Sequence, residues 1–226
     1  MQFKPNDVKK FKDVCDENDI IPVILKENLA KYFVEPILDV GSGKGEIMSQ
    51  SFPEKRVIHI DIQDFSEFKI SQNHTREITD FFSYEPQEKI GTVFLSHALQ
   101  FIDDDIVLLN KKLSEISPDY LVVVANTNKD FMGDLLTWIE KNFKNSNPEI
   151  ELLDFPRGYV PVESAPFTAK VELPDYDQLA LQIAYLFDIR LKQAESSLLA
   201  NYLSQKLSAP SFTIDQEIKV YRKINS

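Results

Sequence analysis

The sequence predicts an α/β fold in which a mostly parallel sheet is covered by helices on both faces. Between residues 37 and 147, short apolar runs alternate with amphipathic stretches, as in strands joined by crossover helices. The run at 118–126 is apolar on both faces, as expected of a central parallel strand. A glycine-rich turn follows the first apolar run, where such folds hold a ligand. Together these observations predict a ligand site at the carboxyl edge of the sheet.

The elements up to residue 147 can be assigned in order. Residues 5–34 carry apolar side chains at helical spacing, and Pro22 suits the start of a helix. The acidic residues 103–105 favour the positive end of the helix that follows them. Strands are expected at 36–40, 56–62, 76–80, 91–97 and 118–126, and helices at 103–117 and 129–143.

The alternation ends near residue 147. Five prolines between residues 148 and 174 predict an irregular connection with one strand at 167–173. Helices are expected near 176–190 and 194–207, and an alternating strand at 212–224 closes the chain. Because this strand comes after helical material, we expect it to fill an antiparallel slot in a mixed sheet.

Composition and charge limit the classes of partner. The chain has 226 residues and a formal net charge of −11, with no visible basic stripe, so nucleic acid is not an expected partner. The charge suits a small or cationic ligand, or serves solubility alone. There is no run of about 18 uncharged apolar residues and no apolar N-terminal segment, so no membrane span or signal peptide is expected. With Cys15 as the single cysteine, we expect a cytoplasmic protein.

The glycine-rich turn reads "ILDVGSGKGEI" and is compatible with few ligands. A P-loop needs serine or threonine after its lysine, but Gly45 follows Lys44. The dinucleotide fingerprint is G-x-G-x-x-G, whereas here Gly41, Gly43 and Gly45 alternate, so the third glycine comes one position early. Asp39, two residues before the first glycine, is also foreign to that fingerprint.

The stretch "LDVGSGKGE" resembles motif I of the class I S-adenosylmethionine-dependent methyltransferases, an acid followed by G-x-G-x-G. The resemblance covers residues 37–128 and implies a Rossmann-like, doubly wound, mixed seven-stranded sheet whose last strand is antiparallel, with a helical lid. It implies S-adenosylmethionine as the cofactor, with its methionine end against the loop. The residues it assigns there are Asp39, Gly41, Ser42, Gly43 and Gly45. We interpret the glycines as clearing room for this part of the cofactor.

Two further acids are expected in such a site. Asp61 ends the second strand about twenty residues after Gly41, which is the spacing of ribose-binding acids. Asp61 is therefore expected to accept the ribose hydroxyls, with Ile62 beside it. Asp80 is expected to bind the adenine amino group, with Phe81 packed on the ring, although the acids of the preceding loop compete for this role.

The segment "FLSHALQF" after the fourth strand is similar to the family's segment beneath the transferred methyl group. Ser96 is expected at the cofactor. His97 could take a proton from the acceptor, since the intrinsic pKa of a histidine lies near 6.5, or could bind the cofactor or cap the next turn instead. The residues expected to contact the acceptor are Tyr32, Phe101, Tyr159 and Tyr185.

The order of parts after the fifth strand is similar to that of histamine N-methyltransferase and related small-molecule enzymes. We therefore expect one domain over 1–226, with a helical cap at 1–36, a cofactor-binding Rossmann-like core at 37–147, a substrate-side insert or lid at 148–210 and the final strand at 211–226. The predicted activity is methyl transfer to nitrogen or oxygen of a small molecule, without a metal, by a monomer or homodimer. The alternatives are a protein methyltransferase and a catalytically silent binding module.

Overall fold

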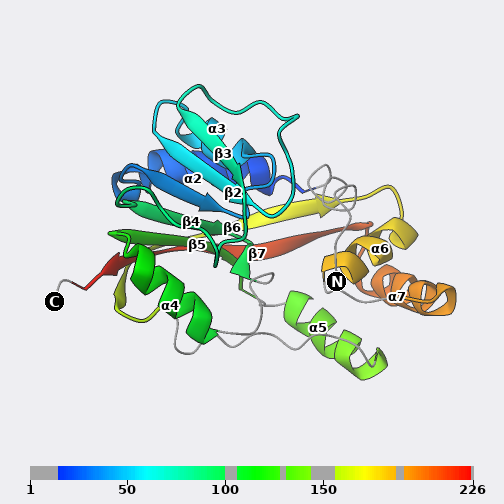
Figure 1. The fold of residues 1–226 in the computed structure, drawn as a ribbon. Coiled ribbons are helices and arrows are strands. Elements are labelled where there is room, and N and C mark those ends of the chain that lie inside the picture. Colours follow the sequence, from blue (N-terminus) through cyan, green and yellow to red (C-terminus); the bar gives the residue numbers. More distant parts are fainter. Residues whose placement is uncertain (1–14, 100–105, 128–130, 144–155, 187–190, 225–226) are drawn as a thin grey trace. The chain divides into compact units, whose positions relative to one another are not determined.

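The computed structural model describes residues 15–99, 106–127, 131–143, 156–186 and 191–224 (Figure 1). Its strands are β1 (Ile37–Val40), β2 (Val57–Asp61), β3 (His74–Ile78), β4 (Thr92–Ser96), β5 (Tyr120–Asn126), β6 (Tyr159–Glu172) and β7 (Ser211–Lys223). Its helices are α2 (Glu17–Glu27), α3 (Glu46–Ser51), α4 (Ile106–Ile116), α5 (Phe131–Asn142), α6 (Tyr176–Leu186) and α7 (Gln193–Lys206), with a 3-10 turn, η1, at Ala30–Tyr32. The predicted strands and helices of the core agree with these to within a few residues.

The strands form one sheet in the order β3-β2-β1-β4-β5-β7-β6. β1 lies between two parallel neighbours, and Ile37 aligns with Val57 of β2 and with Thr92 of β4. All four residues of β1 are buried, which explains why all of them except Asp39 are apolar. The strand order reverses between β1 and β4, and this switch point is where open α/β sheets bind ligands at the carboxyl ends of their strands.

The last strand runs against the others. The Thr127 N–H donates to the Asp215 carbonyl at 2.9 Å, and the Lys223 N–H donates to the Asp119 carbonyl at 3.0 Å. Residue numbers therefore rise along β5 as they fall along β7, which makes the pair antiparallel. The predicted mixed seven-stranded sheet with an antiparallel last strand is confirmed.

The proline-rich stretch differs from the prediction. We expected an irregular connection with a strand at 167–173, but β6 begins at Tyr159 and runs for 14 residues. Pro161 and Pro166 lie within it. β6 is the edge strand of the sheet, and an edge strand tolerates proline because half of its N–H groups have no ladder partner.

The N-terminal helix is also shorter than predicted. We expected helical structure over residues 5–34, of which residues 5–14 lie outside the described part of the chain. In the described part, α2 ends at Glu27, and Pro22 lies inside it instead of at its start. The chain then makes the short η1 turn before β1.

Two compact units can be separated by their contacts, and each has its own core. The first comprises residues 1–18, 127–149 and 167–216, and apolar side chains of α5, α6 and α7 pack in it. The second comprises residues 19–126, 150–166 and 217–226, and its core gathers side chains of β1, β4, β5 and α4. None of the described helices is both long and apolar enough to cross a bilayer. The predicted single domain and its subdivisions stay a prediction.

Candidate cofactor site

The glycine loop joins β1 to α3 in the second unit. Gly41, Gly43 and Gly45 all have positive φ, at 65°, 53° and 76°. This left-handed region is costly for residues with a Cβ atom, so the path of the backbone alone favours glycine at all three positions. The alternating glycines are thus first a consequence of the turn.

The space above two of these glycines is already filled by the protein. A Cβ atom on Gly45 would lie 2.9 Å from Cε1 of His59 and 3.1 Å from a side-chain carbon of Ile70. A Cβ atom on Gly41 would lie 3.3 Å from Cβ of Ala98. Our interpretation that the glycines clear room for a ligand is therefore corrected at Gly45, where the neighbour is a buried imidazole.

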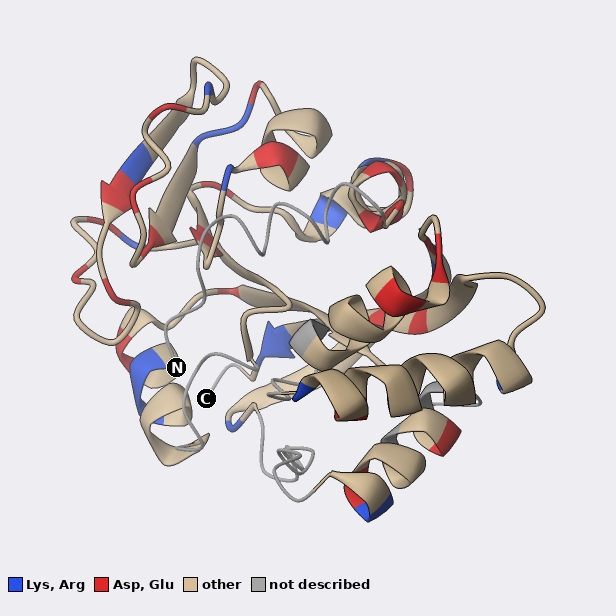
Figure 2. Cartoon of the chain, turned by 90° about the vertical axis from the view of Figure 1, so that its right-hand side faces the viewer, with Lys and Arg blue, Asp and Glu red and all other residues tan. Residues whose placement is uncertain are grey.

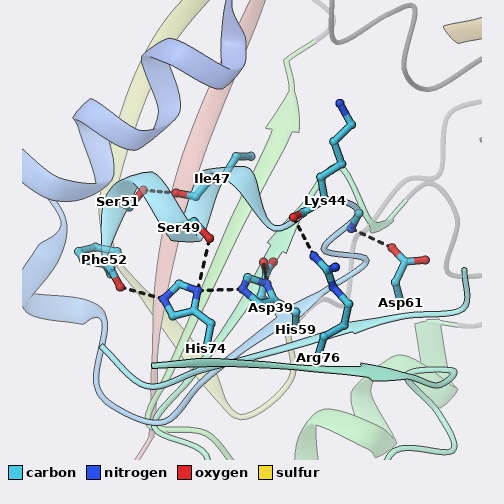
Figure 3. Close-up of polar contacts among 11 residues, drawn as sticks. Asp39, Lys44, Ile47, Ser49, Ser51, Phe52, His59, Asp61, His74 and Arg76 are labelled. Carbon is cyan, nitrogen blue, oxygen red and sulfur yellow. Dashed lines mark hydrogen bonds and ion pairs between the residues drawn. The ribbon is translucent and has the colours of Figure 1, made fainter. Parts of the chain in front are cut away.

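Asp61 is held beside the loop by two backbone groups. The Gly43 N–H donates to Oδ2 of Asp61 at 2.9 Å (Figure 3). The Gln63 N–H donates to Oδ1 at 2.9 Å. An ionised carboxylate offers about four acceptor sites, so two N–H groups fix its orientation and leave acceptor capacity for a ligand. A half-buried, oriented carboxylate at the end of a central strand is suited to binding hydroxyl groups.

Three neighbours of Asp61 are consistent with a ligand at this edge. The side chain of Ile62 is 70% exposed, which is unusual for isoleucine, and it offers an apolar surface directly after the acid. Ser42 Oγ and Gln63 Oε1 are buried yet have no hydrogen-bond partner within the described part of the chain. Buried polar atoms without partners are rare and mark a site where a ligand or water completes the bonding. These groups fit a nucleoside whose sugar and base carry hydroxyl and amino groups.

The loop after β3 contains the other predicted adenine contacts. Asp80 is exposed, and its Oδ2 accepts the N–H and the hydroxyl of Ser83 at 3.1 and 3.2 Å. Phe81 is buried in the core of this unit, while its neighbour Phe82 is only partly buried. Asp80 thus lies accessible in the loop after β3, whereas Phe81 contributes mainly to the core.

The segment after β4 lies against the glycine loop. Ser96 ends β4 and is partly buried. His97 has φ of 50°, and its N–H donates to the Val124 carbonyl at 3.2 Å. A non-glycine residue in this region is strained, and such strain is concentrated at functional sites. Because Ala98 approaches Gly41, the structure brings the His97 segment and motif I together.

Two of the residues predicted to contact the acceptor, Tyr32 and Tyr159, lie away from this edge. Tyr32 carries the carbonyl that accepts the hydroxyl of Thr92, the first residue of β4, and its ring contacts that of Tyr120, the first residue of β5. The hydroxyl of Tyr159 donates to the Pro118 carbonyl, just before β5, and burial raises the pKa of this phenol. Both tyrosines therefore lie by the amino ends of the strands. Phe101 and the side chain of Tyr185 lie outside the described part of the chain.

Three side chains that support the loop were not anticipated. Arg76 of β3 donates from Nη2 to the Lys44 carbonyl at 2.8 Å (Figure 3). Its Nη1 donates to the carbonyls of Phe65 and Phe68. His59 and His74 form a buried chain with Asp39 beneath the loop. The alternation of β2 and β3 could have shown that His59 faces the interior, but the pairing of these side chains depends on a register that the sequence does not reveal.

Comparisons with known proteins agree with this geometry at the level of the fold. No protein-family model and no curated protein matches the sequence. Among solved structures, the chain is similar to N-methyltransferase NodS from Bradyrhizobium japonicum in complex with S-adenosyl-L-homocysteine, with 12% identity, a TM-score of 0.54 and coverage of 97% of this chain and 93% of that chain.

Two further solved structures show that this fold is not tied to one reaction. A cyclopropane-fatty-acyl-phospholipid synthase-like protein from Lactobacillus casei has 12% identity and a TM-score of 0.53, with coverage of 97% of this chain and 100% of that chain. The [4+2]-cyclase SpnF has 14% identity and a TM-score of 0.55, with coverage of 92% and 81%. From its strand order, glycine loop and these similarities, the chain has the Rossmann-like fold of the class I S-adenosylmethionine-dependent methyltransferases.

Proposed function

We propose that the protein is an S-adenosylmethionine-dependent methyltransferase that transfers a methyl group to nitrogen or oxygen of a small molecule. The observation that carries this proposal is the Asp61 carboxylate, fixed by Gly43 and Gln63 at the end of β2 beside the exposed Ile62. The similarity to NodS, whose structure contains S-adenosyl-L-homocysteine, supports the choice of cofactor.

The roles of the residues follow from their chemistry. The cofactor, when bound, supplies an electrophilic methyl group on a cationic sulfur. Asp61 accepts hydrogen bonds from the ribose hydroxyls, and the exposed acid Asp80 is placed to bind the adenine amino group. The glycine loop and Ser42 contact the methionine end. Holding the acceptor in line with the methyl group supplies most of the protein's contribution, since orientation is worth roughly 7–11 kcal/mol in the best intramolecular models.

His97 is the candidate for contact with the acceptor. Its backbone is held by Val124 beside the glycine loop, so the imidazole lies on the segment next to the cofactor site. An amine acceptor that is already neutral needs only orientation by this residue. A hydroxyl acceptor needs a group that removes its proton, and an imidazole can do this near neutral pH.

The charge of the chain supports a small acceptor over a nucleic acid. The formal net charge is −11, and the Lys and Arg residues of the described part are spread among acidic residues (Figure 2). A nucleic-acid enzyme needs a basic surface to displace counterions from phosphates. The same acidic field attracts cationic acceptors such as amines.

The first test is isothermal titration with S-adenosyl-L-homocysteine, beside NAD and ATP. We expect micromolar binding of the homocysteine compound alone, and at least a tenfold loss in Asp61→Asn, because a charged hydrogen-bond acceptor contributes about 1.5–3 kcal/mol. Asp64→Asn is the matched control: Asp64 accepts the Ser66 N–H in the same loop but does not end a strand. Equal binding by both variants, or preferential binding of NAD, would refute the proposal.

A second candidate is a protein that binds the cofactor without transferring its methyl group. The similarity to SpnF favours this possibility, because that protein has a similar fold and is a [4+2]-cyclase. The two candidates differ in product. Incubation with S-adenosylmethionine and a panel of amines, phenols and carboxylic acids yields S-adenosyl-L-homocysteine only if methyl transfer occurs.

A further inference from the structure

Asp39, His59 and His74 form a continuous hydrogen-bonded chain beneath the glycine loop (Figure 3). Nδ1 of His59 lies 2.8 Å from Oδ2 of Asp39, and Nε2 of His59 lies 3.0 Å from Nδ1 of His74. Nε2 of His74 lies 3.0 Å from the Phe52 carbonyl oxygen. The three side chains belong to the adjacent strands β1, β2 and β3, of which β2 lies between the other two, and they are 4%, 0% and 6% exposed. The proposed reaction makes no use of the two histidines.

The geometry of the chain determines how many protons it holds. The Phe52 carbonyl can only accept, so Nε2 of His74 carries a hydrogen. A second hydrogen lies between His59 and Asp39, and a third between the two imidazoles, because each of these contacts needs one donor. Two neutral imidazoles supply only two hydrogens. The chain therefore holds one additional proton, which makes the pair cationic and balances the charge of Asp39.

Loss of this proton would leave one of the three contacts with two facing lone pairs. Burial lowers the pKa of His74. The charged groups that face the pair in the described part are Asp39 from β1 and Glu54 from the loop after α3. The hydroxyl of Ser49 in α3 lies 3.5 Å from Nδ1 of His74. No other titratable partner of the pair is found there.

The chain touches the glycine loop on both sides. Asp39 lies two residues before Gly41, and the ring of His59 lies against Gly45, where a Cβ atom of that residue would point. At the other end, His74 contacts α3 through Ser49 and binds the Phe52 carbonyl just after it. A shift of either imidazole therefore moves the loop or the helix that follows it.

We propose that His59 and His74 are positioning residues of the cofactor site, which hold the glycine loop in its binding conformation through one shared proton. This inference rests on the proposed function. The affinity for the cofactor is highest while the pair is protonated and falls as pH rises and the proton is lost. A pair acting only through charge would have the opposite effect, because loss of the imidazolium would leave Asp39 free to attract the ammonium group of the cofactor.

The test combines binding and spectroscopy of the whole chain. Titration with S-adenosyl-L-homocysteine between about pH 5 and 8, where histidines change charge, is compared for the wild type and His59→Asn. Asparagine retains a donor for Asp39 but cannot hold the proton. We expect roughly tenfold weaker binding in the variant near pH 6 and a flat pH profile, while the wild type loses affinity toward pH 8. The titration of the ligand's own amine is common to both proteins and cancels in the comparison.

Two further measurements keep the outcome clear. The chain has three histidines, and their ring nitrogens can be followed by NMR. Of His59 and His74, one ring should be an imidazolium and the other should be neutral with its hydrogen on Nε2. Glu54→Gln, the control, should keep the pH dependence of the wild type. If His59→Asn does not fold, His74→Gln replaces it, because glutamine retains a donor for the Phe52 carbonyl and cannot carry a charge.

The outcomes separate this inference from the function on which it rests. Absence of binding at every pH would overturn the proposed function, and the inference with it. Binding with the same pH profile in wild type and variant, binding that strengthens toward pH 8, or two neutral rings in the NMR spectrum would overturn the inference alone.

Discussion

Gly45 shows how a residue can match a binding motif and also meet a packing need. Its φ is 76°, and a Cβ atom there would lie 2.9 Å from the His59 ring. Gly158 has nearly the same φ, 78°, but nothing lies within 4 Å of its Cβ position. Substitution of either glycine would therefore force a side chain into the left-handed region, but only at Gly45 would the added Cβ atom also collide with a neighbouring side chain.

This pair gives a matched test of stability. Gly158→Ala should lower the free energy of unfolding by about 1–2 kcal/mol, the cost of a left-handed alanine. Gly45→Ala should lower it by about 1–3 kcal/mol more, because the added methyl group overpacks a buried ring. Urea denaturation of both variants measures the difference. Equal losses would show that the His59 ring yields without cost and does not support the loop closely.

His74 should make stability depend on pH. Burial lowers its pKa below the ordinary value of 6.5, so the unfolded chain takes up a proton there before the native protein does. Neutral His74 makes its full contribution to the free energy of unfolding above about pH 6.5. This contribution is lost as pH falls, by at most about 1.4 kcal/mol per pH unit. Urea denaturation at several pH values should show that wild type and His74→Gln differ most near pH 7 and less near pH 5. A constant difference would contradict this sign.

The loops between strands depend on a few long side chains. Arg76 of β3 binds the Lys44 carbonyl in the glycine loop and the carbonyls of Phe65 and Phe68 in the next loop. One planar guanidinium thus fixes two segments that flank Asp61, and an ammonium cannot reproduce this fork.

Replacement of Arg76 by lysine should loosen both loops together. We expect faster amide exchange over residues 62–70 and a loss of about 1–3 kcal/mol of stability, since charged hydrogen bonds to part-buried carbonyls are lost. Arg56→Lys is the control, because Arg56 forms an exposed ion pair with Glu88 and such pairs contribute about 0–1 kcal/mol. Hydrogen exchange followed by mass spectrometry distinguishes them. Unchanged exchange in Arg76→Lys would show that the loops are held by other contacts.

Local patterns predicted the core strands well and the edge strand β6 poorly. β1, β4 and β5 are buried on both faces, so their apolar runs stand out in the sequence. β6 carries two prolines and many exposed residues, and only its place at the edge of the sheet makes it a strand. Its start at Tyr159 could not be read locally, because edge strands are defined by a distant partner.

The candidate site divides in the same way. Asp61 was identified from its spacing after Gly41, since a strand end beside a glycine loop is a local feature. The chain from Asp39 through His59 to His74 was not identified, because it requires the parallel register that aligns Asp39 with His59 and His59 with Arg76. Nothing in the sequence around Tyr32 or Tyr159 shows that these residues lie at the amino ends of the strands, away from the proposed cofactor site.

The described part of the chain has two hydrophobic cores, and the single tryptophan packs against one of them. Trp138 lies on α5 in the first unit and stacks on Tyr202 at 4.1 Å between ring centroids. The proposed cofactor site lies entirely in the second unit, from Asp39 to His97. Trp138 fluorescence therefore reports the unfolding of a unit to which the cofactor is not proposed to bind.

This arrangement tests whether the chain unfolds as the predicted single domain. β6 and β7 contribute residues to both units, so we expect a single cooperative transition. S-adenosyl-L-homocysteine at about 100 times its dissociation constant adds about 2.7 kcal/mol to the free energy of unfolding. For a chain of this length, this raises the midpoint of thermal unfolding by roughly 5–10 °C. The Trp138 midpoint should rise as much as the midpoint followed by far-UV circular dichroism. In Asp61→Asn, whose binding is expected to be at least tenfold weaker, the same ligand concentration adds at most about 1.4 kcal/mol, so both midpoints should rise by no more than about half as much. If only the circular dichroism midpoint moves, the two units unfold separately and the chain consists of two domains.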